Sequence, residues 1–174
     1  MDDPKPKSTR RRETVLWLLL GLAISFGVAL VVLRLSQQDP MPPLEPADFH
    51  RARERWATAG AANYDIEVVV TGSQPATYRV EVRDGAAQAA WRNGNPLNQK
   101  RTFATWSVPG MFDTMSRDVA NLELHNTGKA EPTTPRLTLR ATFEPRYGYP
   151  ATYRRIEWGS PVEVSWEVTG FEIK

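Results

Sequence analysis

Histidine, cysteine and carboxylate side chains carry much of enzyme chemistry, and this chain of 174 residues is poor in the first two. It has no cysteine, which excludes disulfides, thiolate metal ligands, a catalytic thiol and a lipid-modified cysteine. The two histidines, His50 and His125, lie far apart, and no ligand spacing surrounds either of them. The sequence therefore predicts neither a metal site nor a cofactor.

Carboxylates offer the remaining route to catalysis. Glu144 and Glu157 could approach each other across neighbouring strands, but acidic residues on the wet faces of strands are usually only solvated. The chain has no G-x-S-x-G, H-E-x-x-H or G-x-x-x-x-G-K-S/T motif. We therefore predict that the protein is not an enzyme, and a cell-envelope hydrolase is the most distant of three functional hypotheses.

Aromatic residues in loops are better candidates for chemistry, because tyrosine, tryptophan and arginine dominate recognition surfaces. A Tyr-Gly-Tyr-Pro turn occupies residues 147–150, and two tryptophans near loop ends belong to no core pattern. The remaining tryptophans after the N-terminal region, Trp56, Trp158 and Trp166, lie on patterned elements and are expected in the core. The predicted partner surface consists of Trp91, Trp106, Arg146, Tyr147 and Tyr149.

The positive charge of the chain is concentrated at its N-terminus. The whole sequence holds 22 basic and 20 acidic residues, with a pI near 9.0. Up to Arg34 there are six basic and three acidic residues, so the remainder is close to neutral. A near-neutral domain lacks the charge needed to neutralise phosphates, and we predict no nucleic-acid partner.

The N-terminal region predicts a membrane anchor. Residues 15–33, VLWLLLGLAISFGVALVVL, form 19 consecutive uncharged positions, long enough to cross a hydrocarbon core of about 30 Å. The basic tail, residues 1–14, carries Arg10, Arg11 and Arg12 next to the span, which places the N-terminus in the cytoplasm. We expect a single-pass protein of a bacterial inner membrane, with the chain after the span in the periplasm or another extracytoplasmic space.

Small residues recur every four positions within the predicted span. Gly21, Ser25 and Ala29 would form a ribbon on one side of a helix, where another helix can approach closely. This predicts a possible packing face for self-association or for another membrane subunit.

The rest of the chain reads as a spacer and one domain. Residues 34–45 contain three prolines after position 39 and predict a stiff spacer, and residues 46–174 predict the extracytoplasmic domain. In that domain, helical spacing over residues 46–60 and 107–122 alternates with two sets of three strands. The order is helix, three strands, helix, three strands. We predict an α+β fold with an antiparallel sheet and both helices on one face.

The pentapeptide Pro-Ala-Thr-Tyr-Arg occurs at residues 75–79 and again at 150–154. Both copies fall at the start of the second strand of a meander. Val80 and Val82 share the face of Tyr78, whereas Arg155 and Glu157 share the face of Tyr153. Either a bulge follows Tyr153, or the two tyrosines have different surroundings. The repeat indicates an architectural duplication or chance rather than two binding sites.

Short motifs resemble a known family. They are RARERWATAGAANYDIEV, RVEVRDG, SVPGMFDTM, FEPRYGYPATY and VSWEVTGF, which together cover about residues 49–171. They resemble a family of small bacterial envelope domains of unknown function, often carried on lipoproteins. Many members have a cysteine pair in the first hairpin, which this chain lacks, and here a membrane span stands in place of the lipid anchor. The resemblance implies a location and a fold but no activity.

Two functional hypotheses precede the hydrolase. The first is a membrane-anchored extracytoplasmic binding module for an unknown protein partner, with the bilayer contacted only through the anchor. The second is an accessory subunit of a membrane complex, docked through Gly21, Ser25 and Ala29.

Overall fold

The computed structural model describes residues 41–161 and 163–174, apart from the side chain of residue 59. The predicted basic tail, the span at 15–33 and the packing face of Gly21, Ser25 and Ala29 lie outside the described residues. Within the described ranges, no helix has both the length and the apolar character that a membrane crossing requires.

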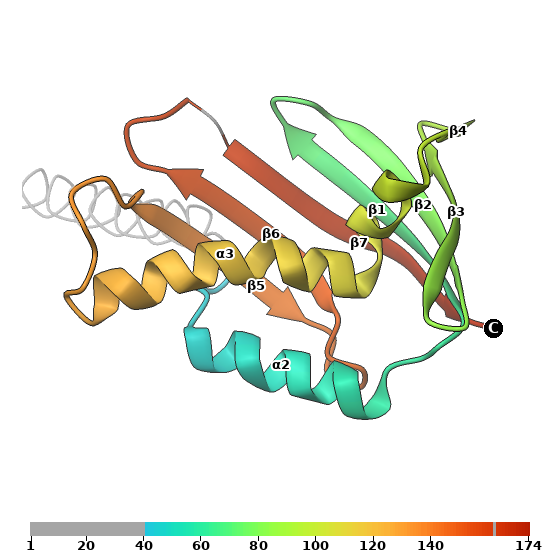
Figure 1. Ribbon diagram of the computed structural model, residues 1–174, viewed down its shortest axis with the longest axis horizontal. Coiled ribbons are helices and arrows are strands. Elements are labelled where there is room, and N and C mark those ends of the chain that lie inside the picture. Colours follow the sequence, from blue (N-terminus) through green and yellow to red (C-terminus); the bar gives the residue numbers. More distant parts are fainter. Residues whose placement is uncertain (1–40, 162) are drawn as a thin grey trace, which may run out of the picture. The chain divides into compact units, whose positions relative to one another are not determined.

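The described chain folds as an α+β domain with three helices and a seven-stranded sheet (Figure 1). The helices are α2 (Pro46–Ala59), the 3-10 helix η1 (Lys100–Trp106) and α3 (Val108–Asn126). The strands are β1 (Tyr64–Gly72), β2 (Ala76–Arg83), β3 (Ala86–Arg92), β4 (Asn95–Pro96), β5 (Leu137–Phe143), β6 (Pro150–Glu157) and β7 (Glu163–Ile173). The predicted α+β class and antiparallel sheet are therefore confirmed.

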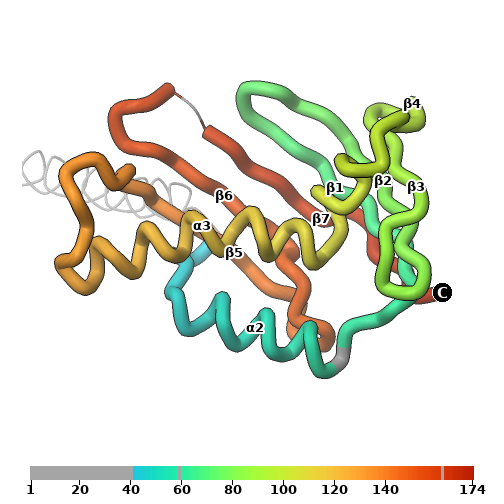
Figure 2. The backbone as a smooth tube through the Cα atoms, viewed as in Figure 1, coloured from blue at the N-terminus to red at the C-terminus, as the bar shows by residue number. Residues whose placement is uncertain are grey.

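The last strand joins the two meanders into one sheet. The strand order is β4-β3-β2-β1-β7-β6-β5, and every pairing is antiparallel. β7 pairs with β1 on one side and with β6 on the other, as the path of the chain in Figure 2 shows. The first strand of one meander, β1, and the last strand of the other, β7, thus lie side by side at the centre of the sheet.

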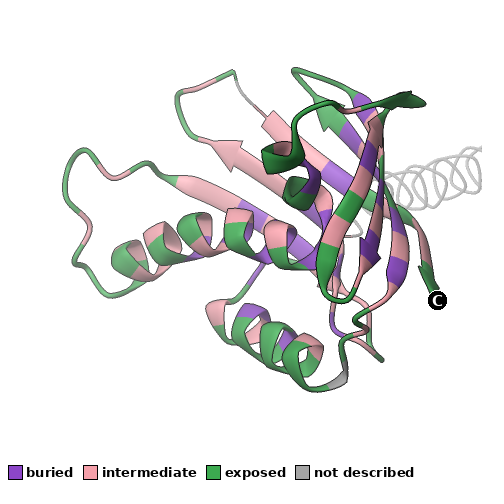
Figure 3. Cartoon of the chain, turned by 45° about the vertical axis from the view of Figure 1, so that its right-hand side comes forward, coloured by how far each residue is buried: buried purple, intermediate pink, exposed green. Residues whose placement is uncertain are grey.

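Side-chain alternation gives the sheet one buried and one open face. In β1 the residues Tyr64, Ile66 and Val68 are buried, while the residues between them are exposed or partly exposed. The Tyr64 ring packs edge-on against Trp56 of α2, and its hydroxyl accepts a hydrogen bond from the backbone N–H of Val108 in α3. Both helices therefore cover the same face, and the buried residues gather beneath them (Figure 3).

Helix α3 begins and packs as its sequence predicts. The Ser107 side chain accepts a hydrogen bond from the N–H of Gly110, and proline stands in the first turn. The buried residues of this helix recur three or four positions apart, which keeps them on one side. They are Val108, Met111, Phe112, Met115 and Val119.

The end of the predicted spacer belongs to the fold. Pro43 bridges to Arg140 of β5, and the N–H of Leu44 donates to the carbonyl of Leu139 at 2.9 Å. Leu44 is buried in the core, and the compact unit begins at Met41 rather than at residue 46. The predicted stiff spacer therefore extends too far, because the proline-rich residues at its end pair at a sheet edge instead of lying outside the domain.

The segment between β3 and α3 also contains regular structure. Asn95 and Pro96 form the short strand β4, and residues from Lys100 to Trp106 form η1. Phe103 is buried in this segment and holds it against the sheet. Two-residue strands and 3-10 helices are too short to give a periodic pattern, so sequence reasoning missed both.

The two Pro-Ala-Thr-Tyr-Arg copies place their tyrosines on the same face of the sheet. Tyr153 pairs with Trp166 and Arg155 pairs with Val164, with no register shift between them. The bulge proposed after Tyr153 is therefore absent, and Arg155 faces the helices. Tyr78 stacks on Trp106, whereas Tyr153 is buried and bonded to Asp118, so the surroundings of the two tyrosines do differ.

Candidate functional site

The predicted partner surface is dispersed over the domain. Trp91 lies on the open face of the sheet, where the Arg79 guanidinium stands 5.6 Å from the centre of its ring. Trp106 lies on the helix-covered face, where it stacks on Tyr78 at 4.9 Å and meets Trp166 edge-on. The structure does not bring these two tryptophans together.

The Tyr-Gly-Tyr-Pro turn is mainly a packing element. Tyr149 stacks on Phe171 of β7 with ring centres 4.4 Å apart, and Tyr147 lies 5.9 Å from the same ring. Gly148 has a φ of 83°, and a Cβ there would stand 2.5 Å from the carbonyl oxygen of Ala52 in α2. The turn therefore needs glycine in order to dock against the helix. Arg146, the predicted residue directly before the turn, is exposed.

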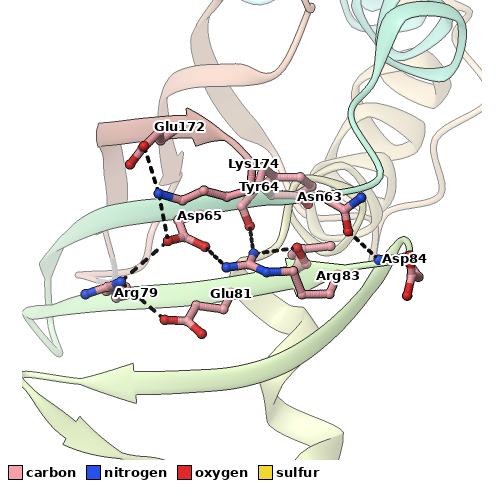
Figure 4. A network of polar contacts seen from close by, with 10 residues as sticks. Asn63, Tyr64, Asp65, Arg79, Glu81, Arg83, Asp84, Glu172 and Lys174 are labelled. Carbon is pink, nitrogen blue, oxygen red and sulfur yellow. Dashed lines mark hydrogen bonds and ion pairs between the residues drawn. The ribbon is translucent and has the colours of Figure 1, made fainter.

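The open face carries a network of charges centred on Asp65 (Figure 4). The Asp65 carboxylate forms ion pairs with Arg83 at 2.8 Å, Arg79 at 3.5 Å and Lys174 at 3.8 Å. Two further acids complete the network, because Glu81 binds Arg79 and Glu172 binds Lys174. Three positive and three negative groups thus neutralise one another. Because each charge of this network already has a partner, an incoming ion could bind only by breaking an existing ion pair.

A second polar cluster fastens α3 to the sheet. The Tyr153 hydroxyl donates to Asp118 at 2.7 Å, and the Arg155 guanidinium donates to the same carboxylate at 3.1 Å. Arg155 also binds Glu157 at 2.7 Å. Burial raises the pKa of Tyr153 well above its ordinary value, and the neighbouring Asp118 charge raises it further. The hydroxyl therefore stays protonated and acts as a structural donor.

The two glutamates considered for catalysis lie at opposite ends of one hairpin. Glu144 follows β5 and accepts hydrogen bonds from the backbone N–H groups of Arg146 and Tyr147. Glu157 ends β6, where it pairs with Leu137 at the beginning of β5. The proposed approach of these two carboxylates is wrong, because the hairpin separates them along its full length.

Trp158 was predicted in the core, but 69% of its surface is exposed. It directly follows β6, at the start of the turn that leads to β7. Its backbone N–H donates to the carbonyl of Arg136, and its indole N–H donates to the Thr138 hydroxyl, each at 2.9 Å. The first bond fixes the backbone at Trp158, and the second holds the indole in place at the surface.

The Trp158 indole borders a pocket of about 350 Å³ beside the beginning of β5 and the C-terminal part of α3. We call this surface the Trp158 platform; it consists of Leu122, His125, Arg136, Leu137, Thr138 and Trp158. Its lining divides about evenly between apolar and polar surface, and a threonine, a histidine and an arginine are among the residues that form it. Figure 1 shows α3 beside β5 and β6; Arg136 directly precedes β5, and Trp158 directly follows β6. The volume is at the small end of the range for ligand pockets, about 300 to 1,000 Å³.

The cations of the platform differ in what they contact. The Nε2 of His125 donates to the Pro135 carbonyl at 3.1 Å, because a carbonyl can only accept. Arg136 forms no ion pair with any acid of the described chain, and no acidic residue among residues 41–161 and 163–174 lines the pocket. A guanidinium without a counter-ion beside an exposed aromatic ring can bind an oxygen anion.

No family model matches the chain, and no curated protein matches it either. In the part of the chain that the structure covers, no three histidine, aspartate or glutamate side chains gather in a way that could hold a metal ion.

Sequence reasoning missed Trp158 because this residue stands two positions after Ile156 and so continues the alternating pattern of β6. The signal that marks the exposed position is the Gly-Ser-Pro sequence at residues 159–161, which ends the strand directly after the tryptophan. A large aromatic at the first position of a turn need not lie in the core.

Proposed function

We propose that the protein is a membrane-anchored, extracytoplasmic binding module without catalytic activity, and that it docks a partner protein on the Trp158 platform. The single observation that carries this proposal is an indole exposed over 69% of its surface but fixed by its own N–H. Leaving apolar surface in water forgoes about 25 cal/mol per Å² of stabilisation. An aromatic ring held in position at that cost is typical of a recognition anchor.

The anchor part of the proposal rests on the sequence. Nineteen uncharged residues follow three consecutive arginines, and by the positive-inside rule this pattern favours a location of the folded domain outside the cytoplasm. The resemblance to small envelope domains supports the same location. Tethering raises the local concentration of the domain near membrane partners, so a single small platform suffices for useful binding.

The test is crosslinking of the full-length protein in intact membranes, followed by affinity purification. We expect a specific partner that is lost with Trp158→Ala and retained with Trp91→Ala, a matched tryptophan on the open face. A partner that survives Trp158→Ala contradicts docking on the platform.

The alternative, an accessory subunit, is favoured by the small-residue ribbon of the span. It predicts that the partner disappears with Gly21→Ile and Ser25→Ile, whereas Trp158→Ala has no effect. The same purification therefore separates the two hypotheses.

A further inference from the structure

We infer that the group bound on the Trp158 platform is an apolar side chain standing next to a carboxylate, as an acidic segment of the partner protein would present it. This inference rests on the proposed function and adds the chemical class of what is bound. Size, lining and charge each support it.

The size and the lining of the pocket indicate that the bound group contains an apolar side chain. A pocket of about 350 Å³ suits one large side chain or a similarly small ligand. Leu122 and Leu137 are half-buried and, with the Trp158 ring, form its apolar walls. An apolar group bound there removes its own apolar surface and that of the pocket from contact with water, which is the main source of binding energy.

The positive charge of Arg136 indicates that the bound group also contains a carboxylate. Arg136 lies in the lining without an acidic partner among the described residues, and the His125 Nε2–H is already engaged by Pro135. The guanidinium matches a carboxylate in shape and can donate two parallel hydrogen bonds to it. A carboxylate close to the apolar group would therefore complete the site.

The hydrogen bonds of Trp158 favour a polypeptide over a lipid surface. A tryptophan at a bilayer interface keeps its N–H at the wet, headgroup side. Here the indole N–H is directed to Thr138 within the domain, and the ring borders a concave pocket. A concave site with a satisfied N–H suits an inserted side chain better than a flat membrane.

The test uses the full-length protein in nanodiscs, with tryptophan indoles labelled with ¹⁵N and the Trp158 signal assigned by its loss in Trp158→Phe. The probes are phenylacetate and its uncharged isostere phenylacetamide. We expect phenylacetate to shift the Trp158 signal with an affinity about tenfold higher than that of phenylacetamide, since one charge-assisted interaction distinguishes them. Arg136→Gln should abolish this preference, and the exposed Arg101→Gln, in η1 and outside the pocket, should leave it intact.

Three results would overturn the inference. Equal affinity for the two probes, or a preference that survives Arg136→Gln, would show that Arg136 does not bind a carboxylate on the platform. Absence of any shift removes the apolar pocket as a ligand site. Paramagnetic broadening of the Trp158 signal by spin-labelled lipid in the nanodisc identifies the bilayer as the occupant instead. Loss of the partner with Trp158→Ala would still support the proposed function in the first case, so the two failures are distinguishable.

Discussion

The Asp65 network and the Trp158 platform are both surfaces of aromatic and charged groups, but they differ in what remains unpaired. In the network, Asp65 holds three cations, and the Trp91 ring is already matched with Arg79. On the platform, the Trp158 ring faces solvent, and Arg136 has no counter-ion in the described chain. A surface whose charged groups all pair with one another supports the fold, whereas a surface with an unpaired charged group is suited to binding.

The difference also explains why charge alone is a poor guide to function here. The network contains more ionic groups than the platform and is the more conspicuous feature of the open face (Figure 4). Each of its groups gains its partner on folding, so binding a ligand there would first require breaking an ion pair. Binding on the Trp158 platform requires no ion pair to be broken, because Arg136 forms none within the described chain.

The largest effect is expected where a complete cluster is broken beneath a helix. Asp118→Ala leaves the Tyr153 hydroxyl and the Arg155 guanidinium without their shared acceptor. Both groups are mostly buried, so we expect the free energy of unfolding to fall by about 3 kcal/mol. Denaturant unfolding of the full-length protein in detergent measures this. Asp118→Asn, which keeps an acceptor for Tyr153, should lose less; an equal loss would show that the hydrogen bond contributes nothing.

The next effect is a loss of stability at alkaline pH. Burial raises the pKa of Tyr64 from 10.0 to about 12. The folded state therefore holds this proton more tightly than the unfolded state, and the resulting stability is complete below pH 10 and is lost as the pH rises through 12. The loss attributable to Tyr64 is about 2 to 3 kcal/mol. Unfolding curves between pH 9 and 12 measure it.

Tyr64→Phe is the control for this pH dependence. It removes the titrating group, so its unfolding free energy should decline less steeply above pH 10 than that of the natural protein. The buried Tyr153 hydroxyl, whose pKa burial also raises, keeps part of the decline in this variant. Identical slopes for the two proteins would contradict the assignment to Tyr64.

A smaller effect is expected from the network itself. Asp65→Asn removes the central charge and leaves Arg79, Arg83 and Lys174 near one another. We expect the free energy of unfolding to fall by about 1 to 2 kcal/mol, because Asp65 is mostly buried but its partners are partly solvated. Glu172→Gln is the matched control at an exposed site of the same network and should change stability by less than about 0.5 kcal/mol. If the two variants behave alike, Asp65 is not the centre of the network.

The smallest effect on stability is expected at the platform. Trp158→Ala and Arg136→Gln remove exposed groups that support little of the fold, so each should change the unfolding free energy by less than about 0.5 kcal/mol. Thermal or denaturant unfolding of both variants checks this. A loss above about 2 kcal/mol in either variant would place these residues in the same structural role as the network and remove the contrast between the two surfaces.

The fold was predictable where periodic patterns are long. The spacing from Val108 to Val119 specifies α3, and the alternation from Tyr64 to Val70 specifies β1 and the direction of its buried face. The short elements β4 and η1 gave no such pattern. Leu44 escaped notice because its burial depends on pairing with β5, nearly a hundred residues away in the sequence.

The candidate site was less predictable, because it depends on contacts between distant residues. Trp91 and Trp106 were identified as surface aromatics, yet both are matched by neighbours that only the pairing of strands supplies. Trp158 was assigned to the core because its strand pattern runs up to it. Whether an aromatic is satisfied within the fold is a property of its three-dimensional neighbours, and a single sequence does not contain it.

Hydroxyl-radical footprinting tests the central claim most directly. The oxidation of Trp158 in the full-length protein would be measured by mass spectrometry in native membranes and after purification, with Trp91 as an internal reference. If the platform is the docking surface, Trp158 is protected in native membranes and becomes reactive on purification, whereas Trp91 reacts equally in both. Equal oxidation of Trp158 in the two preparations would contradict the claim that a partner occupies the platform.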